Sequence, residues 1–455
     1  MIAVLLFFEF AIWMACLLHC QARRQLSVLQ PVTILLAYHF LFHLMKPALW
    51  YFFDHNHAFE YMKFYPNEEE ATNSILISIV GLLTSYLGYT FFFSFSNASI
   101  QRRLAPAING ARVPSTARIL ILLTLTVSFI AFVQRVRGYL GSDEGFQLVQ
   151  DARTGNFGFS QGSGWWFELS SAYVFCALYL WMASRFSRSW TIAVCVLGSF
   201  WLTLGSSRFV FVYAVITGSI LFVLRSGFNI RKFLLLLPFA VMLIIAFVVL
   251  GQNRAAIREM VFDTSSTTRP TDEWKRVSPL DTLDMSTFEV QTAAISIVPR
   301  LTDSYTYFTE HVRLLTEPIP RALWPSKPFG DPIKTIEINR FANMVTLSTG
   351  WYGQGWLSFG LVGVVATCLI YVMLSSFILR TLLLNIGPNA AFAYTVLIPL
   401  HLQWMRDGVL VSVTKFTLFL TLPAIISAVV GRQSSRSKSR TALARHASDS
   451  SRHPV

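Results

Sequence analysis

The stretch LSFGLVGVVATCLIYVMLSSFIL, residues 357–379, is 23 residues long and contains no charged side chain. A helix rises about 1.5 Å per residue, so a run of this length can cross the roughly 30 Å hydrocarbon layer of a bilayer. We therefore predict an all-α integral membrane protein with about eleven transmembrane helices. Comparable apolar runs supply the other ten spans, at residues 2–20, 31–53, 74–96, 118–134, 165–184, 190–205, 209–225, 233–251, 388–404 and 408–430.

The composition supports this fold class. Of the 455 residues, 54% are hydrophobic and 13% are charged, whereas soluble domains carry about 25% charged residues. The formal net charge of +13 does not indicate a nucleic-acid partner, because the excess lies in short loops and the tail. All five cysteines lie inside apolar runs, so we expect neither a disulfide framework nor a cysteine metal site.

Basic side chains gather in alternate short loops and in the tail, where Asp449 is the one acid among them. Cytoplasmic loops are enriched in Lys and Arg, so we place this set in the cytoplasm, the N-terminus outside and the C-terminus inside. The set comprises Arg23, Arg24, Arg102, Arg103, Arg112, Arg118, Arg185, Arg188, Arg225, Arg231, Lys232, Arg380, Arg432, Arg436, Lys438, Arg440, Arg445 and Arg452.

Four regions follow from the apolar pattern. Residues 1–251 form an N-terminal bundle of eight spans, and residues 351–430 supply the remaining three. Residues 252–350 form one large external loop, in which we expect short helices because long structureless loops are uncommon. The Ser- and Arg-rich residues 431–455 are predicted to be a disordered basic tail against anionic lipid headgroups.

Two arginines lie on the side opposite the basic loops. Arg208 ends the Gly-Ser-Ser-Arg turn at 205–208, and Arg406 lies in the Trp-Met-Arg-Asp turn at 404–407. A lone guanidinium at a tight external turn needs an anionic partner, and we predict that the substrate supplies it. The alternatives are a headgroup contact for Arg208 and a structural pairing with Asp407 for Arg406.

A proline-rich segment of the external loop displays further cations. Four prolines within residues 317–328 enforce a stiff, extended path, on which Arg321, Trp324 and Lys327 are presented at the membrane surface. Alternatively, Trp324 is an interfacial anchor and the segment is only a connector.

Four short motifs resemble those of a known family. Ile-Pro-Arg-Ala-Leu-Trp-Pro-Ser-Lys-Pro at 319–328 resembles the external-loop motif of the Wzy-type oligosaccharide repeat-unit polymerases of O-antigen, enterobacterial common antigen and capsule assembly. The turn at 205–208 is similar to that family's Gly-(small)-Arg turn. Residues 351–361 resemble its re-entry into the membrane, and residues 405–408 its Arg-acid-Gly turn. The order matches, and the resemblance is strongest over residues 200–430.

The resemblance implies a glycosyltransferase of the bacterial inner membrane with its active site on the external face. Such an enzyme transfers a growing glycan from an undecaprenyl diphosphate carrier to the terminal sugar of another lipid-linked unit, and it uses no cofactor. The expected partners are the lipid-linked oligosaccharide, membrane lipids, a flippase and a chain-length regulator. Cations would bind the diphosphate and stabilise its developing charge; the candidates are Arg208, Arg406, Arg321, Lys327, Arg254 and Arg300.

Glycosyl transfer also needs a group that accepts the proton of the acceptor hydroxyl. Asp407 is the first choice as this base, because it adjoins Arg406 at the membrane rim, and Asp303 and His401 follow. Tyr352, in the re-entry segment, is a further candidate for the site. Arg300 and Asp303 are three residues apart, so on a helix they share a face and form an internal ion pair.

Three other features have two interpretations each. Lys415, inside an apolar run, is either functional or the structural partner of an acid such as Glu168. Arg254 is either a diphosphate ligand or a solvated helix end. His39 and His43, four residues apart, are better explained by packing than by metal binding, because no third ligand has a matching spacing.

Three other functions compete with the polymerase: an O-antigen ligase, a transporter or flippase of the lipid-linked unit, and a regulatory membrane protein. Transporters are often built from repeated halves with short external loops. This chain has one very long loop and no visible repeat, which favours an enzyme.

Overall fold

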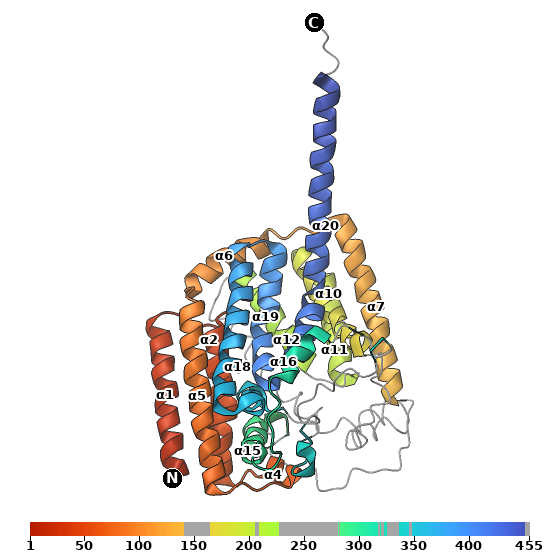
Figure 1. Ribbon diagram of the computed structural model, residues 1–455. Helices are drawn as coiled ribbons and strands as arrows, with labels where there is room; N and C mark the ends of the chain where they lie inside the picture. The colour runs from red at the N-terminus through yellow and green to blue at the C-terminus, as the bar shows by residue number, and fades with distance from the viewer. Residues whose placement is uncertain are drawn as a thin grey trace.

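The computed structural model describes residues 1–140, 164–204, 209–226, 281, 283–316, 319, 323–324, 336–344 and 348–450. Within these ranges the protein is all-helical, as the apolar pattern predicts, and the ranges contain no strand. Figure 1 shows the longer helices running side by side in one bundle.

The helices are named as in Figure 1. They are α1 Ile2–Ala22, α2 Pro31–His39, the π-helix η1 Phe40–Met45, α3 Lys46–Phe53, α4 His57–Met62, α5 Glu68–Phe92, α6 Asn97–Asn109, α7 Ser115–Leu140, α9 Gly164–Leu169, α10 Ala172–Ala183, α11 Arg188–Leu204, α12 Phe209–Ser226, η3 Leu283–Met285, α15 Thr287–Ile297, α16 Thr309–Thr316, η4 Ile338–Arg340, α18 Gly350–Leu384, α19 Pro388–Asp407 and α20 Leu410–Ser450.

Seven stretches of the described residues are long and apolar enough to cross a membrane. Each coincides with a predicted span; they are Ile2–Ala22, Pro31–Phe53, Glu68–Phe92, Ser115–Val136, Phe209–Ser226, Gly350–Leu384 and Val413–Gly431. Three more predicted spans coincide with α10, α11 and α19, which are shorter or less apolar helices. The predicted span 233–251 lies outside the described residues, so the count of eleven stays a prediction.

The two ends of the bundle differ. Figure 1 shows α1 beginning at the end where α4 and α15 lie, which we call the N-terminal face, whereas α20 leaves from the opposite end, which we call the tail face. The helices alternate in direction, so the short loops after α1, α10 and α18 all reach the tail face, where α6 also lies. The basic loops of the described chain therefore share one end of the bundle.

The helix α18 is two helices joined at a break. Phe359 and Gly360 have non-helical backbone angles, and the φ of Gly360 is +58°, a conformation that suits glycine. A Cβ on Gly363 would lie 2.1 Å from the carbonyl oxygen of Gly355, so the two halves pack backbone to backbone. The predicted span therefore begins after this break, and residues 350–358 form a separate short helix.

The second span contains a π-helix with a local cause. Pro47 has no amide hydrogen and so cannot donate the α-helical hydrogen bond to the carbonyl of His43, four residues earlier. The helix widens into η1 over Phe40–Met45, directly before this proline. Single π turns inside α-helices are frequent at functional sites, because they change the direction of the side chains.

The helix α20 extends beyond the last predicted span. Its backbone continues as a helix to Ser450, and the disorder expected for residues 431–455 stays a prediction. No glycine or proline interrupts residues 432–450, and Ala, Leu, Arg and Lys all have high helix propensity.

Candidate functional site

The helix α19 runs from the tail face toward the N-terminal face, and the Arg406–Asp407–Gly408 turn ends it. Asp407 is the last residue of α19, and Gly408 ends the helix with a φ of +67°. A Cβ on Gly408 would lie 2.5 Å from the carbonyl oxygen of Gly350. The turn is therefore pressed against the start of α18, and it needs glycine for both reasons.

Neutral side chains from four segments hold this turn. Asp407 accepts hydrogen bonds from the Ser348 hydroxyl, at 3.2 Å, and from the side chain of Gln403. The Gln403 carbonyl in turn accepts from the Tyr213 hydroxyl of α12, at 2.9 Å. The Tyr371 hydroxyl of α18 donates to the Gly408 carbonyl at 2.8 Å. The position of the turn is therefore determined by α12, α18 and α19 together.

Charged side chains from four elements gather beside the turn. The electrostatic neighbours of Glu168 in α9 are Arg135 of α7, Lys415 of α20 and Asp407, and Arg406 adjoins Asp407. Glu168 is the acid that the sequence suggested as a partner for Lys415. Three cations and two carboxylates leave a net positive charge, which suits an anion. We call these five residues the Arg406 cluster.

Several predicted cations lie outside the described residues: Arg208, Arg254, Arg321 and Lys327. The chain resumes at Phe209, directly after Arg208, and the Phe209 ring contacts Tyr213 and Phe416, with centroids 5.6 and 4.6 Å away. The start of α12 therefore adjoins the Arg406 cluster. Trp324 is described and is partly buried.

The predicted pairing of Arg300 with Asp303 is wrong. The Arg300 guanidinium instead lies 2.9 Å from the Glu70 carboxylate, and 63% of its side chain is exposed. The helix α15 ends at Ile297, and Pro299 follows, so Arg300 and Asp303 lie in turns and do not share a helix face. Asp303 is exposed, with a φ of +53°. Neither residue is in contact with the Arg406–Asp407–Gly408 turn.

His401 is buried inside the bundle, one turn and a half before Asp407. Its Nδ1 donates to the Leu397 carbonyl at 2.7 Å, and its ring stacks on Trp404 with centroids 4.4 Å apart. Both contacts lie within α19 itself, so His401 and Asp407 do not form one hydrogen-bonded unit.

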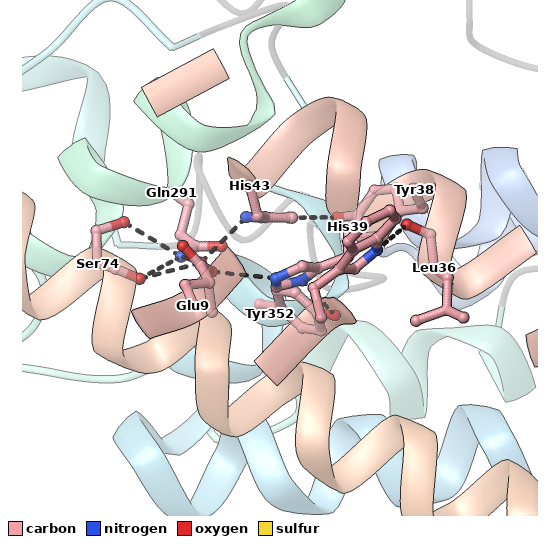
Figure 2. A network of polar contacts seen from close by, with 10 residues as sticks. Glu9, Leu36, Tyr38, His39, His43, Ser74, Gln291 and Tyr352 are labelled. Carbon is pink, nitrogen blue, oxygen red and sulfur yellow. Dashed lines mark hydrogen bonds and ion pairs between the residues drawn. The ribbon is translucent and has the colours of Figure 1, made fainter. Parts of the chain in front are cut away.

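Tyr352 belongs to a buried polar network that the sequence did not reveal (Figure 2). The Tyr352 hydroxyl lies 3.4 Å from Nδ1 of His39, and Nε2 of His39 lies 3.0 Å from the carboxylate of Glu9 in α1. The Tyr352 ring packs flat on Gly81 of α5, where a Cβ would lie 2.4 Å away. Glu9 and His39 are fully buried within the bundle.

His43 connects this region to two further elements (Figure 2). Its Nε2 lies 3.0 Å from the Tyr38 hydroxyl, and its Nδ1 lies 3.1 Å from the Ser78 hydroxyl of α5. Gln291 of α15 donates to Ser78 at 2.9 Å and to the Ser74 carbonyl at 3.1 Å. The histidines that we assigned to packing are thus hydrogen-bonded on both ring nitrogens or paired with an acid.

A buried charge triad lies one turn further along the same span. The Lys46 ammonium lies 2.6 Å from Asp281 and 3.0 Å from Glu289 of α15. Lys46 and Glu289 are fully buried, and Asp281 is 13% exposed. Burial raises the pKa of Glu289 to about 7, although the neighbouring Lys46 opposes this shift. The triad ties α15 to the membrane-spanning bundle.

One signal in the sequence points to this network. Glu9, His39, His43 and Lys46 are ionisable residues inside apolar runs, and such residues are functional candidates by default. Their partners Ser78 and Gln291 carry no comparable signal, because they are ordinary polar residues on distant segments. Within the described ranges, no group of three or more His, Cys, Asp or Glu side chains is arranged to hold a metal ion.

The fold and the site define a multi-pass, all-helical membrane protein with a charged cluster at one end of the bundle and a polar network behind it. Comparisons with protein-family models, with curated proteins and with solved structures find no match to this chain.

Proposed function

We propose that this protein is a glycosyltransferase that joins undecaprenyl-diphosphate-linked oligosaccharide units at the external face of the bacterial inner membrane. The observation that carries the proposal is the Arg406–Asp407–Gly408 turn, with its surrounding charges, at the end of the bundle opposite the basic loops. The order of the four Wzy-like motifs supports the same function.

The orientation rule makes the N-terminal face the external one, since the basic loops of the tail face belong in the cytoplasm. A lipid-linked diphosphate lies at headgroup level, which is where a helix-end cluster can reach it. Arg406 can bind phosphate oxygens in a bidentate manner, and Arg135 and Lys415 add positive charge. The full proposal has eleven spans, with Arg208, Arg254, Arg321 and Lys327 as further diphosphate ligands.

The proposed reaction forms a bond between the acceptor hydroxyl oxygen and the anomeric carbon of the donor glycan. The bond from that carbon to the diphosphate breaks, and its electron pair stays on the diphosphate. The cations stabilise the charge that develops there. One charge-assisted hydrogen bond contributes about 1.5–3 kcal/mol, so the loss of Arg406 should slow turnover at least about tenfold. Asp407 is held in place to orient the acceptor hydroxyl or to accept its proton.

A transporter of the same lipid-linked unit is the second candidate. The observation that favours it is the set of ionisable residues inside the spans, Glu9, His39, His43 and Lys46, because such residues often line transport pathways. A ligase, which would deliver the glycan from the same carrier to a different acceptor, uses the same diphosphate chemistry. For the polymerase, a flippase and a chain-length regulator are the expected protein partners.

The test uses purified protein in liposomes with undecaprenyl-diphosphate-linked oligosaccharides extracted from the native host. Polymerase activity produces lipid-linked chains of several repeat units from these substrates alone. Elongation only after a second acceptor is added indicates a ligase. Movement of the intact lipid across the bilayer, without a new glycosidic bond, indicates a transporter. Either of these last two results, or no reaction, would overturn the polymerase proposal.

A further inference from the structure

The helix α16 belongs to the predicted external segment, yet it contacts α18 well inside the membrane-spanning part of that helix. The ring of His311 lies against the ring of Tyr371, with centroids 6.2 Å apart, and α16 also packs against α20. From the break at Gly360 to Tyr371, α18 makes about three turns, or about 16 Å along its axis. The tyrosine side chain leans back toward the break, but it is too short to cover that distance. The helix α16 therefore lies beside the spans and not beyond their ends.

The position of α16 in the fold agrees with this contact. Figure 1 shows α16 alongside the longer helices and nearer to the tail face than α15 and α4, which belong to the end of the bundle. Of the described helices in the predicted external segment, α16 is thus the one at the depth of the spans.

The exposed and buried sides of α16 are the reverse of those expected in water. Glu310 is 2% exposed, whereas Val312 and Leu315 are 58% and 78% exposed. The guanidinium of Arg313 lies 3.8 Å from the Glu310 carboxylate, so the arginine and the acid of this helix lie close to each other. A helix on a water-facing surface buries its apolar residues and exposes its charged ones. The outward side of α16 therefore suits an apolar surrounding.

The exposed apolar side of α16 is continuous with that of α18. Tyr307, just before α16, is 59% exposed, and its ring lies 6.1 Å from the ring of Phe359, which is 48% exposed. The backbone N–H of Tyr307 donates to the Ser358 carbonyl at 3.0 Å and fixes this junction. The exposed apolar side of α18, a helix long and apolar enough to cross a membrane, continues from Phe359 through Leu361, Val362, Met373 and Phe377.

We propose that α16 is inserted into the membrane leaflet on the side of the N-terminal face, where Tyr307, Val312 and Leu315 contact lipid acyl chains. A helix of this kind lies with its apolar side at the boundary between headgroups and acyl chains. The ring of Tyr307, with its polar hydroxyl, suits the same boundary. The lipid contact does not depend on the proposed glycosyltransferase activity.

The inner side of α16 connects this lipid contact to the functional site. Both Glu310 of α16 and Asp407 act electrostatically on Tyr371, and the Tyr371 hydroxyl donates to the carbonyl of Gly408. One side of α16 thus meets lipid, and the other meets the side chain that holds the Arg406–Asp407–Gly408 turn. The bilayer then helps to keep α16 in place beside this turn.

The experiment measures which quencher reaches a fluorescent label on α16. It uses the full-length protein with Cys195→Ser, which removes the exposed thiol, in vesicles of phosphatidylethanolamine and phosphatidylglycerol. A bimane label at Leu315→Cys meets either iodide, present on both sides of the membrane, or lipids with bromine on their acyl chains. The brominated lipids should cause a large loss of fluorescence, and iodide should cause little. Val312→Cys should give the same result.

Two exposed positions serve as controls. Val362→Cys reports lipid contact, because Val362 is 65% exposed on the membrane-spanning part of α18. Asn339→Cys reports water contact, because Asn339 is exposed and follows Ile338, which packs in one cluster with residues of α4. A label at position 315 that is quenched like the label at 339 would show that α16 faces water, and the proposal would fail. Protection from both quenchers would also overturn it, because protein, such as a second copy of the chain, would then cover α16.

Discussion

The Lys46 ammonium lies 3.0 Å from the Glu289 carboxylate, and neither side chain is exposed to solvent. This contact joins a membrane-spanning helix to α15, a short helix of the segment between the eighth and ninth predicted spans. A second carboxylate, that of Asp281, shares the same ammonium at 2.6 Å. The triad therefore holds one positive charge between two carboxylates. Loss of the cation and loss of one carboxylate should thus differ in their effect on stability.

Removing the cation should be more damaging than removing one acid. Lys46→Met leaves two carboxylates buried without their cation and should destabilise the protein by about 3–5 kcal/mol. Glu289→Gln keeps the Lys46–Asp281 pair and should cost about 1 kcal/mol or less at neutral pH. Thermal unfolding in detergent compares the two variants. Equal losses would mean that the triad does not act as a charge cluster.

The contribution of Glu289 to the stability of the protein should fall as the pH rises from about 4.5 toward 7. The pKa of Glu289 is about 7 in the folded state and 4.5 as its ordinary value. Between these values the folded state holds a proton that the unfolded state has lost, so rising pH favours unfolding, by at most about 1.4 kcal/mol per pH unit. Above pH 7 this contribution levels off. Unfolding curves of Glu289→Gln should lack this slope, and a wild-type slope in that variant would contradict the assignment.

Gly408→Ala should damage the turn. The added methyl group would lie 2.5 Å from the Gly350 carbonyl oxygen, and the backbone φ of +67° disfavours alanine. We expect a loss of about 1–3 kcal/mol of stability and a strong loss of chain extension. Gly387→Ala is the control, because nothing lies within 4 Å of its Cβ position. Similar unfolding temperatures for the two variants would show that the turn tolerates a side chain.

Arg406 and Arg300 should differ in their effect on activity. Arg406→Ala removes a cation from the cluster and should slow chain extension at least about tenfold. Arg300→Ala breaks an exposed pair with Glu70, a kind of contact that contributes about 0–1 kcal/mol, and should leave the rate almost unchanged. Chain lengths on a gel measure both variants. Equal rates would remove Arg406 from the site.

Cysteine labelling tests the orientation of the bundle. Of the five cysteines, Cys195 is exposed and the other four are buried. The Cys195→Ser variant therefore has no exposed cysteine that would react with the label. In that background, Asp303→Cys should react with an impermeant maleimide added outside intact cells, and Asn109→Cys should not react. Both positions are exposed, and they belong to opposite faces of the bundle. The reverse labelling pattern would invert the topology and place the Arg406 cluster in the cytoplasm.

The spans were predictable because a backbone in lipid must satisfy its own hydrogen bonds, so apolar length alone indicates a helix. The polar turn at Arg406 could also be predicted, because it interrupts two apolar runs. The network was not predictable, because the contacts of His43 with Ser78 and Tyr38 depend on how α5 packs and on the wider helix before Pro47. The Arg300–Asp303 pairing failed because Arg300 pairs with Glu70 of α5, a contact between segments far apart in the chain, and Asp303 has a left-handed backbone conformation instead of a helical one.

The Glu9–His39 contact has a consequence for how the first helix assembles. Most of the spanning part of α1 faces outward, with 22% of it buried, and its residues are apolar on nearly every side. Hydrophobic packing alone therefore does not favour one rotation of α1 about its own axis over another. The carboxylate of Glu9 is its one acid, and a single imidazole inside the bundle receives it. Together with the hydrogen bonds of Trp13 to the Leu36 carbonyl and of His19 to the Tyr86 hydroxyl, this contact selects the rotational setting of α1 when the helix docks.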